Sequence, residues 1–196
     1  MESGLSDPRL RSNVLIVALL NFVFFGVEFA VALSIGSISL FADSIDFLKG
    51  ASVSVLIAFA LGWSMKARTR VGMGLAGILV LPALALLWAL WSKFNNPIPP
   101  EPSTLWLTGA VGLIVNWSCA FLLGRFHSVS LARAALLFAR ADAVANVAIF
   151  LTGLVTAYVW QSVWPDVIVG LAIAVMNVDA GRAVWRAAHE EHKAAV

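Results

Sequence analysis

The chain has 196 residues, of which 61% are hydrophobic and only 12% are charged, and its mean hydropathy is +0.91. Soluble domains have about 45–50% apolar and about 25% charged residues, so this composition excludes a soluble domain and indicates an integral membrane protein. The formal net charge of +2 is too small to indicate a nucleic-acid partner. A single cysteine, Cys119, excludes an intrachain disulfide and a metal cluster built from several cysteines.

Six apolar segments are long enough to cross a bilayer, whose core of about 30 Å requires about 20 helical residues. They predict transmembrane helices near residues 13–34, 40–63, 71–92, 104–123, 134–158 and 165–187. Gly36 and Ser37 leave a very short turn between the first two, which are therefore expected to be antiparallel neighbours. Residues 93–103 contain four prolines and predict an irregular external loop.

The basic residues define an orientation. With six helices, one side of the membrane holds Arg9, Arg11, Lys66, Arg68, Arg70, Arg125, Arg133, Arg182, Arg186 and Lys193, whereas the opposite loops hold only Lys93. The positive-inside rule then places both termini in the cytoplasm. We therefore expect an all-α, multi-pass membrane protein, located in the bacterial inner (plasma) membrane. It comprises a cytoplasmic tail at 1–12, a six-helix domain at 13–187 and a cytoplasmic tail at 188–196, with no C-terminal soluble domain.

Residues 36–51, GSISLFADSIDFLKGA, place Asp43, Asp46 and Lys49 inside a membrane-length apolar segment. A charged side chain at the centre of a membrane helix costs roughly 2.5–3.5 kcal/mol on insertion scales. Such residues persist where they face a cavity, pair with a partner or bind a cation. Asp43 and Asp46 are three residues apart and share one helix face.

A second polar stretch occurs at residues 137–147, LFARADAVANV, where Asp142 and Asn146 are four residues apart and share a face. At a rise of about 1.5 Å per residue, Asp46 and Asp142 lie at similar depths in their helices. Paired carboxylates suit a divalent cation or a proton relay. The spacing predicts an intramembrane ion site formed by Asp43, Asp46, Asp142 and Asn146, and it leaves the ion open.

Structural alternatives stand beside this prediction. Asp46 and Lys49 are spaced i,i+3, as in a buried ion pair without any metal. Asp43 is one turn nearer the outside, where it would cap the helix or line a vestibule. Glu28 either faces the site or is solvated near the outer surface. Arg140 lies across the helix from Asp142 and is expected to extend to the cytoplasmic interface.

The segment GSISLFADSIDFLKGAS resembles the second-helix signature of the cation diffusion facilitators, approximately G-S-x-(A/S)-L-x-A-D-(A/S)-x-(H/D)-x-x-x-D. LLFARADAVANVAIFLTG is similar to their fifth helix and WPDVIVGLAIAVMNVDAGRAVW to their sixth. The resemblance implies a homodimer in the lipid bilayer that exports a divalent metal, such as zinc, cobalt or cadmium, in exchange for protons. It implies no enzymatic activity and no resident cofactor, because the metal is the transported substrate.

In that family the ion is held by two side chains on the second helix and two on the fifth, each pair four residues apart. Carried over to this chain, these positions are Asp46, Gly50, Phe138 and Asp142. Side chains that would complete the shell, if they face the same cavity, are Asp43, Asn146, Asn21, Glu28 and Asn116. Two functions follow: a proton-coupled divalent cation transporter, or a non-transporting relative that serves as a membrane scaffold or partner subunit. A third hypothesis, an intramembrane enzyme, finds no Ser/His pair, HExxH or di-Asp peptidase motif in the sequence to support it.

Overall fold

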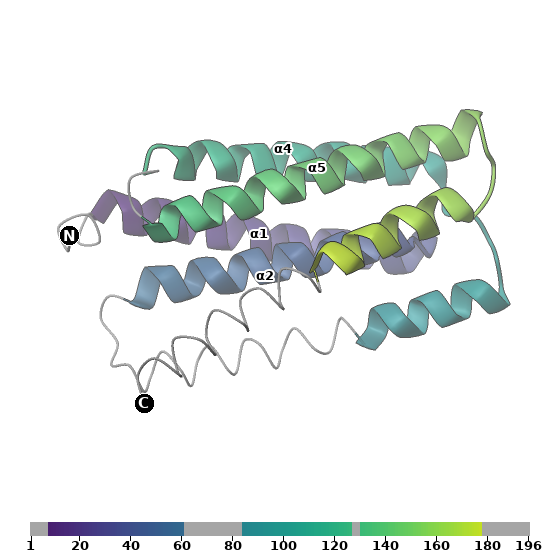
Figure 1. Ribbon diagram of the computed structural model, residues 1–196, viewed down its shortest axis with the longest axis horizontal. Helices are drawn as coiled ribbons and strands as arrows, with labels where there is room; N and C mark the ends of the chain where they lie inside the picture. The colour runs from purple at the N-terminus through teal and green to yellow at the C-terminus, as the bar shows by residue number, and fades with distance from the viewer. Residues whose placement is uncertain (1–7, 61–83, 127–129, 178–196) are drawn as a thin grey trace.

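The computed structural model describes residues 8–60, 84–126 and 130–177, and the regular structure in these ranges is entirely α-helical. The elements are α1 (Pro8–Ile35), α2 (Ile38–Ala60), a helical segment at residues 84–95, α4 (Pro102–Gly124), α5 (Ser130–Tyr158) and a helix at Trp164–Asn177. The long helices α1, α2, α4 and α5 run side by side along the longest axis of the molecule (Figure 1). The predicted all-helical class is confirmed for these residues.

Three of the described helices are long and apolar enough to cross a bilayer, judged by length and composition: Arg9–Ile35, Pro102–Gly124 and Ala139–Tyr158. Helix α2 is 23 residues long, but it carries Asp43, Asp46 and Lys49. The bundle therefore combines these three helices with α2, which carries three ionisable residues within its span.

The helices begin earlier than hydropathy predicts. Helix α1 begins at Pro8 and α4 at Pro102, because proline fits the first helical turn, where its missing N–H group has no intrahelical acceptor. Helix α5 begins at Ser130. Parts of the predicted segments 71–92 and 165–187, and the whole predicted tail at 188–196, lie outside the described residues.

The predicted short turn between the first two helices is confirmed, since α1 ends at Ile35 and α2 begins at Ile38. Gly36 has a φ of +64°, in the left-handed region that glycine adopts without a Cβ clash. The backbone N–H of Ser37 donates to the carbonyl oxygen of Ala32 at 3.0 Å, which closes α1 with a Schellman-type cap. This cap makes α1 and α2 an antiparallel hairpin.

The N-terminus of α2 is capped by Asp166, a residue from the Trp164–Asn177 helix. Oδ1 of Asp166 accepts hydrogen bonds from the Ser37 hydroxyl at 2.7 Å and from the Ser39 hydroxyl and N–H at 2.6 and 3.1 Å. Oδ2 accepts from the Ile38 N–H at 2.7 Å. A buried carboxylate at this position satisfies helix donors and complements the positive end of the helix dipole.

The helix begins at Trp164, one residue before the predicted start at 165, so Asp166 lies in its first turn. The contact is tight, because a Cβ added at Gly170 would lie 2.7 Å from Cγ2 of Ile38. The Trp164–Asn177 helix is therefore packed directly on the start of α2.

The polar residues of the bundle lie between two apolar clusters. One cluster contains Leu10, Val14, Val17, Ile57, Ala58, Cys119, Leu123, Leu136 and Ala139. The other contains Ala32, Leu40, Phe41, Ala42, Leu105, Ala145, Ile149 and Ile173. Along α1, α2, α4 and α5, the residues Asn21, Glu28, Asp43, Asp46, Asn116 and Asp142 fall between members of the two clusters. The apolar clusters thus enclose a polar layer in mid-bundle.

Helices α4 and α5 approach each other closely at glycines. A Cβ at Gly153 would lie 2.6 Å from the backbone N of Trp106, and one at Gly109 would lie 2.9 Å from the backbone N of Phe150. Small residues at such crossings allow membrane helices to pack backbone against backbone. These contacts fix an antiparallel register between α4 and α5.

The Asp166 cap generates a stability prediction. Asp166→Ala leaves buried donors at the start of α2 without an acceptor, so we expect it to lower the free energy of unfolding by about 2 kcal/mol or more. Asp166→Asn keeps one acceptor oxygen and is expected to lose less. Thermal unfolding followed by circular dichroism in detergent measures both.

Glu101→Ala is the matched control, because Glu101 caps α4 from an exposed position by accepting from the N–H groups of Ser103 and Thr104. Hydrogen bonds from Ser103 and Thr104 lower the pKa of Glu101 to about 2, so this cap is ionised at neutral pH. Water replaces an exposed cap, and its loss is expected to cost less. Equal losses for Asp166→Ala and Glu101→Ala would contradict the buried cap.

Candidate metal-ion site

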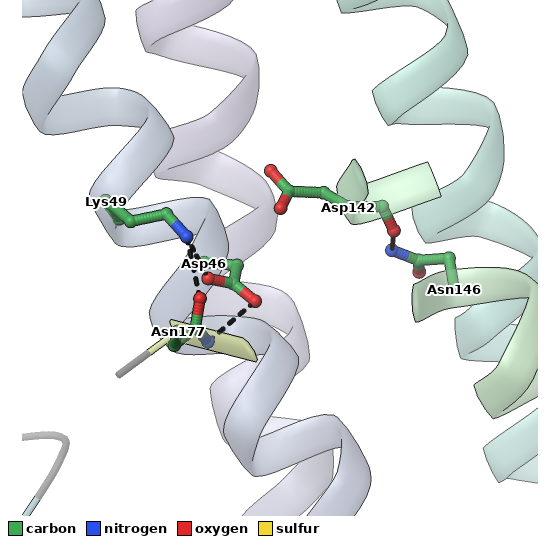
Figure 2. A network of polar contacts seen from close by, with 5 residues as sticks. All are labelled: Asp46, Lys49, Asp142, Asn146 and Asn177. Atoms are coloured by element: carbon green, nitrogen blue, oxygen red, sulfur yellow. Dashed lines mark hydrogen bonds and ion pairs between the residues drawn. The ribbon is translucent and has the colours of Figure 1, made fainter. Parts of the chain in front are cut away.

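Asp46 lies at the centre of a three-residue polar network. Its Oδ1 pairs with the Nζ of Lys49, and its Oδ2 accepts from Nδ2 of Asn177 at 2.9 Å. The same Lys49 Nζ donates to Oδ1 of Asn177 at 2.8 Å, which closes the network (Figure 2). A buried ion pair is retained when further hydrogen bonds satisfy both partners, as Asn177 does here. The structure therefore shows the Asp46–Lys49 ion pair that the i,i+3 spacing allows.

Asp142 faces this network from α5. Its carboxylate points from α5 toward Lys49 and Asp46 (Figure 2). It also lines a cavity of about 20 Å³, enough for one water-sized occupant, whose polar wall is formed by Asn21, Ser54, Asn116, Cys119 and Asp142. The structure therefore brings the two predicted carboxylates of α2 and α5 to facing positions.

Gly50, one of the two positions without a ligating side chain, also borders this cavity. A Cβ at Gly50 would lie 2.7 Å from Oδ1 of Asn21. The Nδ2 group of Asn21 is engaged by the carbonyl oxygen of Val17 and the sulfur of Cys119, which orients Oδ1 toward Gly50. An amide oxygen from α1 thus occupies the space beside the missing α2 ligand. The side chain of Phe138, the other such position, lies outside the described part of the chain.

Asp43 belongs to a second polar group with Glu28. Both side chains are fully buried, and their carboxyl groups lie near each other. Two ionised carboxylates are both acceptors, and none of the four oxygens has a hydrogen-bond donor among the described residues. The predictions of a solvated Glu28 and of a vestibule-lining Asp43 are therefore wrong, because α4 and α5 cover this part of the hairpin.

Asn146 lies next to this second group rather than in the cavity beside Asp142. Its Nδ2 donates to the backbone carbonyl of Asp142 at 3.0 Å. A Cβ added at Gly112 would lie only 2.0 Å from Oδ1 of Asn146, and this oxygen has no hydrogen-bond partner in the described structure. The four predicted site residues therefore fall into two adjacent groups: Asp46 with Asp142, and Asp43 with Asn146.

No group of three or more His, Cys, Asp or Glu side chains that would hold a metal ion occurs in the described ranges 8–60, 84–126 and 130–177. Among the described residues, neutral oxygens are therefore the donors available to complete the shell of a cation at Asp46 and Asp142. Asn21 and Asn116 line the same cavity as Asp142, and both are buried. Of the side chains that the sequence offered to complete the ligand shell, Asn21 and Asn116 are the ones that lie beside Asp142.

Sequence reasoning missed Asn177 and Asp166. Asn177 contacts both members of the ion pair, and Asp166 fixes the start of the helix that carries them. An available signal was their spacing of 11 residues, about three helical turns, which places both on one face of the same helix.

A family model for the cation efflux transmembrane domain matches residues 14–189. Because this match covers most of the chain, the protein belongs to the cation efflux transmembrane-domain family. The resemblance inferred from the second, fifth and sixth helical segments is thereby confirmed. The family comprises metal cation transporters of the membrane rather than enzymes. A search of curated proteins finds no match to this chain.

The space beside Gly50 generates a testable coupling. Gly50→Ala introduces a Cβ against Oδ1 of Asn21, so we expect it to destabilise the protein by about 1 kcal/mol or more. The same change in an Asn21→Ala background, where the amide is absent, is expected to cost less. Thermal unfolding of the wild type, both single variants and the double variant gives the coupling. Strictly additive effects would contradict the contact between Asn21 and Gly50.

Proposed function

We propose that this protein transports a divalent metal cation in exchange for protons and binds the cation between Asp46 and Asp142. The observation that carries the proposal is the pair of buried carboxylates, one from α2 and one from α5, that face each other in the polar layer. Carboxylates in a membrane bundle are costly, and a transported cation offsets that cost. Family membership supports a metal cation as the substrate.

The available donors indicate which cations would bind. Asp46 and Asp142 supply carboxylate oxygens, Asn21 supplies an amide oxygen, and Asn116 lines the same cavity. Oxygen ligands suit hard and borderline divalent ions, and zinc accepts carboxylates at tetrahedral sites. Two carboxylates beside one lysine give a weakly charged site, which favours release as well as binding.

Lys49 acts as an internal counter-ion in this proposal. Its ammonium group is paired with Oδ1 of Asp46, the oxygen atom to which a metal ion would bind. A divalent ion about 5 Å from that ammonium would be opposed by several kcal/mol at an effective dielectric near 20. Metal binding therefore requires Lys49 to swing away or to release its proton.

Proton coupling is supported by the second polar group. Glu28 and Asp43 are adjacent, buried and without donors among the described residues, so a shared proton would satisfy both carboxyl groups. A metal ion arriving at Asp46, one turn along α2, would repel that proton. The pair is thus the proposed site of proton exchange.

The orientation is also proposed from residue placement. The start of α1, which carries Arg9 and Arg11, and the end of α4, which Arg125 follows, lie at the same end of the bundle (Figure 1). Lys93 instead donates to the carbonyl of Gly36, just after the other end of α1. This asymmetry supports six spans with both termini in the cytoplasm of a bacterial inner membrane. We also propose that two copies of the chain assemble as a homodimer.

A second candidate function rests on one specific observation. Both oxygens of Asp46 are already engaged, by Lys49 and Asn177. In a non-transporting relative this network would be a permanent structural element, and the protein would serve as a membrane scaffold or partner subunit.

Lys49→Ala separates the two functions. If Lys49 competes with the metal, its removal should lower the half-saturating metal concentration by about tenfold or more, since each tenfold corresponds to about 1.4 kcal/mol. Asp142→Asn should abolish the metal response. The measurement is uptake of zinc, cobalt or cadmium into liposomes that contain a pH-sensitive dye.

Lys93→Ala is the matched control, because it removes a lysine whose Nζ donates to the Gly36 carbonyl, away from the site. It is expected to leave the half-saturating concentration unchanged. If the wild type and the Lys49→Ala variant are both folded and neither takes up any of the three metals, the result would contradict transport and favour the scaffold function.

A further inference from the structure

A groove of about 600 Å³ lies between α4 and α5, on the side of α5 away from the ion site. Nine of its eleven lining residues are apolar or glycine, and the other two are Arg125 and Arg140. The apolar wall includes Trp117, Phe121 and Val144, which are exposed by 71%, 66% and 66%. The groove therefore combines a lipid-facing apolar wall with two permanent positive charges.

The register of the two helices places both guanidinium groups toward the same end of the groove. Gly112 lies beside Asn146 and Gly153 beside Trp106, so the antiparallel register places Arg140 beside about residue 118 of α4. The Cζ atom of Arg125 lies 5.0 Å from the ring centroid of Phe121, so its side chain extends back along α4 toward Arg140. Phe121 and residue 118 are about one helical turn apart.

Two exposed arginines on facing helices, one of them extended along α4 toward the other, suit a phosphate, because arginine binds phosphate oxygens through paired N–H donors. Free phosphate would use only that end of the groove and would leave most of the apolar wall uncovered. A phospholipid uses both, with its headgroup on the arginines and an acyl chain along Trp117 and Val144. Basic pockets between membrane helices recognise anionic headgroups in this way.

We propose that the groove between α4 and α5 binds an anionic phospholipid, whose phosphate is held by Arg125 and Arg140. Arg140 is exposed whereas Asp142 is buried, so the lipid and the cation occupy opposite sides of α5. The lipid site stands independently of the proposed transport. In the orientation proposed above, the headgroup lies in the cytoplasmic leaflet.

The test compares phosphatidylglycerol with phosphatidylcholine of identical acyl chains, added to the purified full-length protein in detergent. Bound lipid is counted by native mass spectrometry, and thermal unfolding is followed in parallel. The wild type should retain phosphatidylglycerol and unfold several degrees higher with it, but not with phosphatidylcholine. The variant with Arg125→Gln and Arg140→Gln should bind phosphatidylglycerol about tenfold or more weakly.

Two variants keep the test decisive. Arg9→Gln with Arg11→Gln removes two positive charges from α1, outside the groove, and should bind the lipid as the wild type does. Arg125→Lys with Arg140→Lys keeps the charge but loses the planar donors, and should bind with intermediate affinity; it also serves if the glutamine variant does not fold.

Three results would overturn the proposal. They are equal binding of the two lipids, unchanged phosphatidylglycerol binding in the glutamine variant, and displacement of the lipid by inorganic phosphate at similar concentration. The wild type could instead form a dimer without bound lipid that dissociates in the glutamine variant. That result would identify the groove as an interface between copies.

Discussion

The structure depends on the requirement that charge buried in α2 be neutralised inside the bundle. Asp46 and Lys49 neutralise each other, and Asn177 supplies a hydrogen bond to each. Removing one partner of such a pair would leave an uncompensated charge that costs about 3–5 kcal/mol. The two apolar clusters that bracket the polar layer keep this network away from the helix ends. The site is therefore part of the packing of the four long helices.

The Trp164–Asn177 helix positions α2 at two points. Asp166 accepts hydrogen bonds from the first turn of α2. Asn177 lies about 16 Å from Asp166 along the Trp164–Asn177 helix, at about 1.5 Å per residue, and contacts the ion pair. A rotation of α2 would strain both contacts at once. The consequence for function is that Asp46 is held at a fixed depth and orientation opposite Asp142. A cation that displaced Lys49 in the proposed site would also loosen Asn177, and occupancy would then be connected to the packing of this helix.

Part of this arrangement follows from the sequence. Composition and apolar segments indicate the all-helical membrane class, the short turn at Gly36 follows from its residues, and the charges in the second and fifth segments single out Asp46 and Asp142. The spacing of Asp142 and Asn146 shows that they share a helix face, but it does not show how α5 is rotated against α2, and Asn146 contacts Gly112 of α4 instead. The burial of Glu28 and the roles of Asp166 and Asn177 arise from contacts between distant segments, which local periodicity does not encode.

The central claim is that a divalent cation takes the place of Lys49 on Asp46 and reaches Asp142 from there. Anomalous diffraction from crystals grown with zinc, recorded on both sides of the zinc absorption edge, tests it most directly. The account predicts one zinc peak between the carboxylates of Asp46 and Asp142, with Nζ of Lys49 no longer bonded to Asp46. Zinc bound at neither carboxylate, with Lys49 still joined to Asp46 and Asn177, would contradict it.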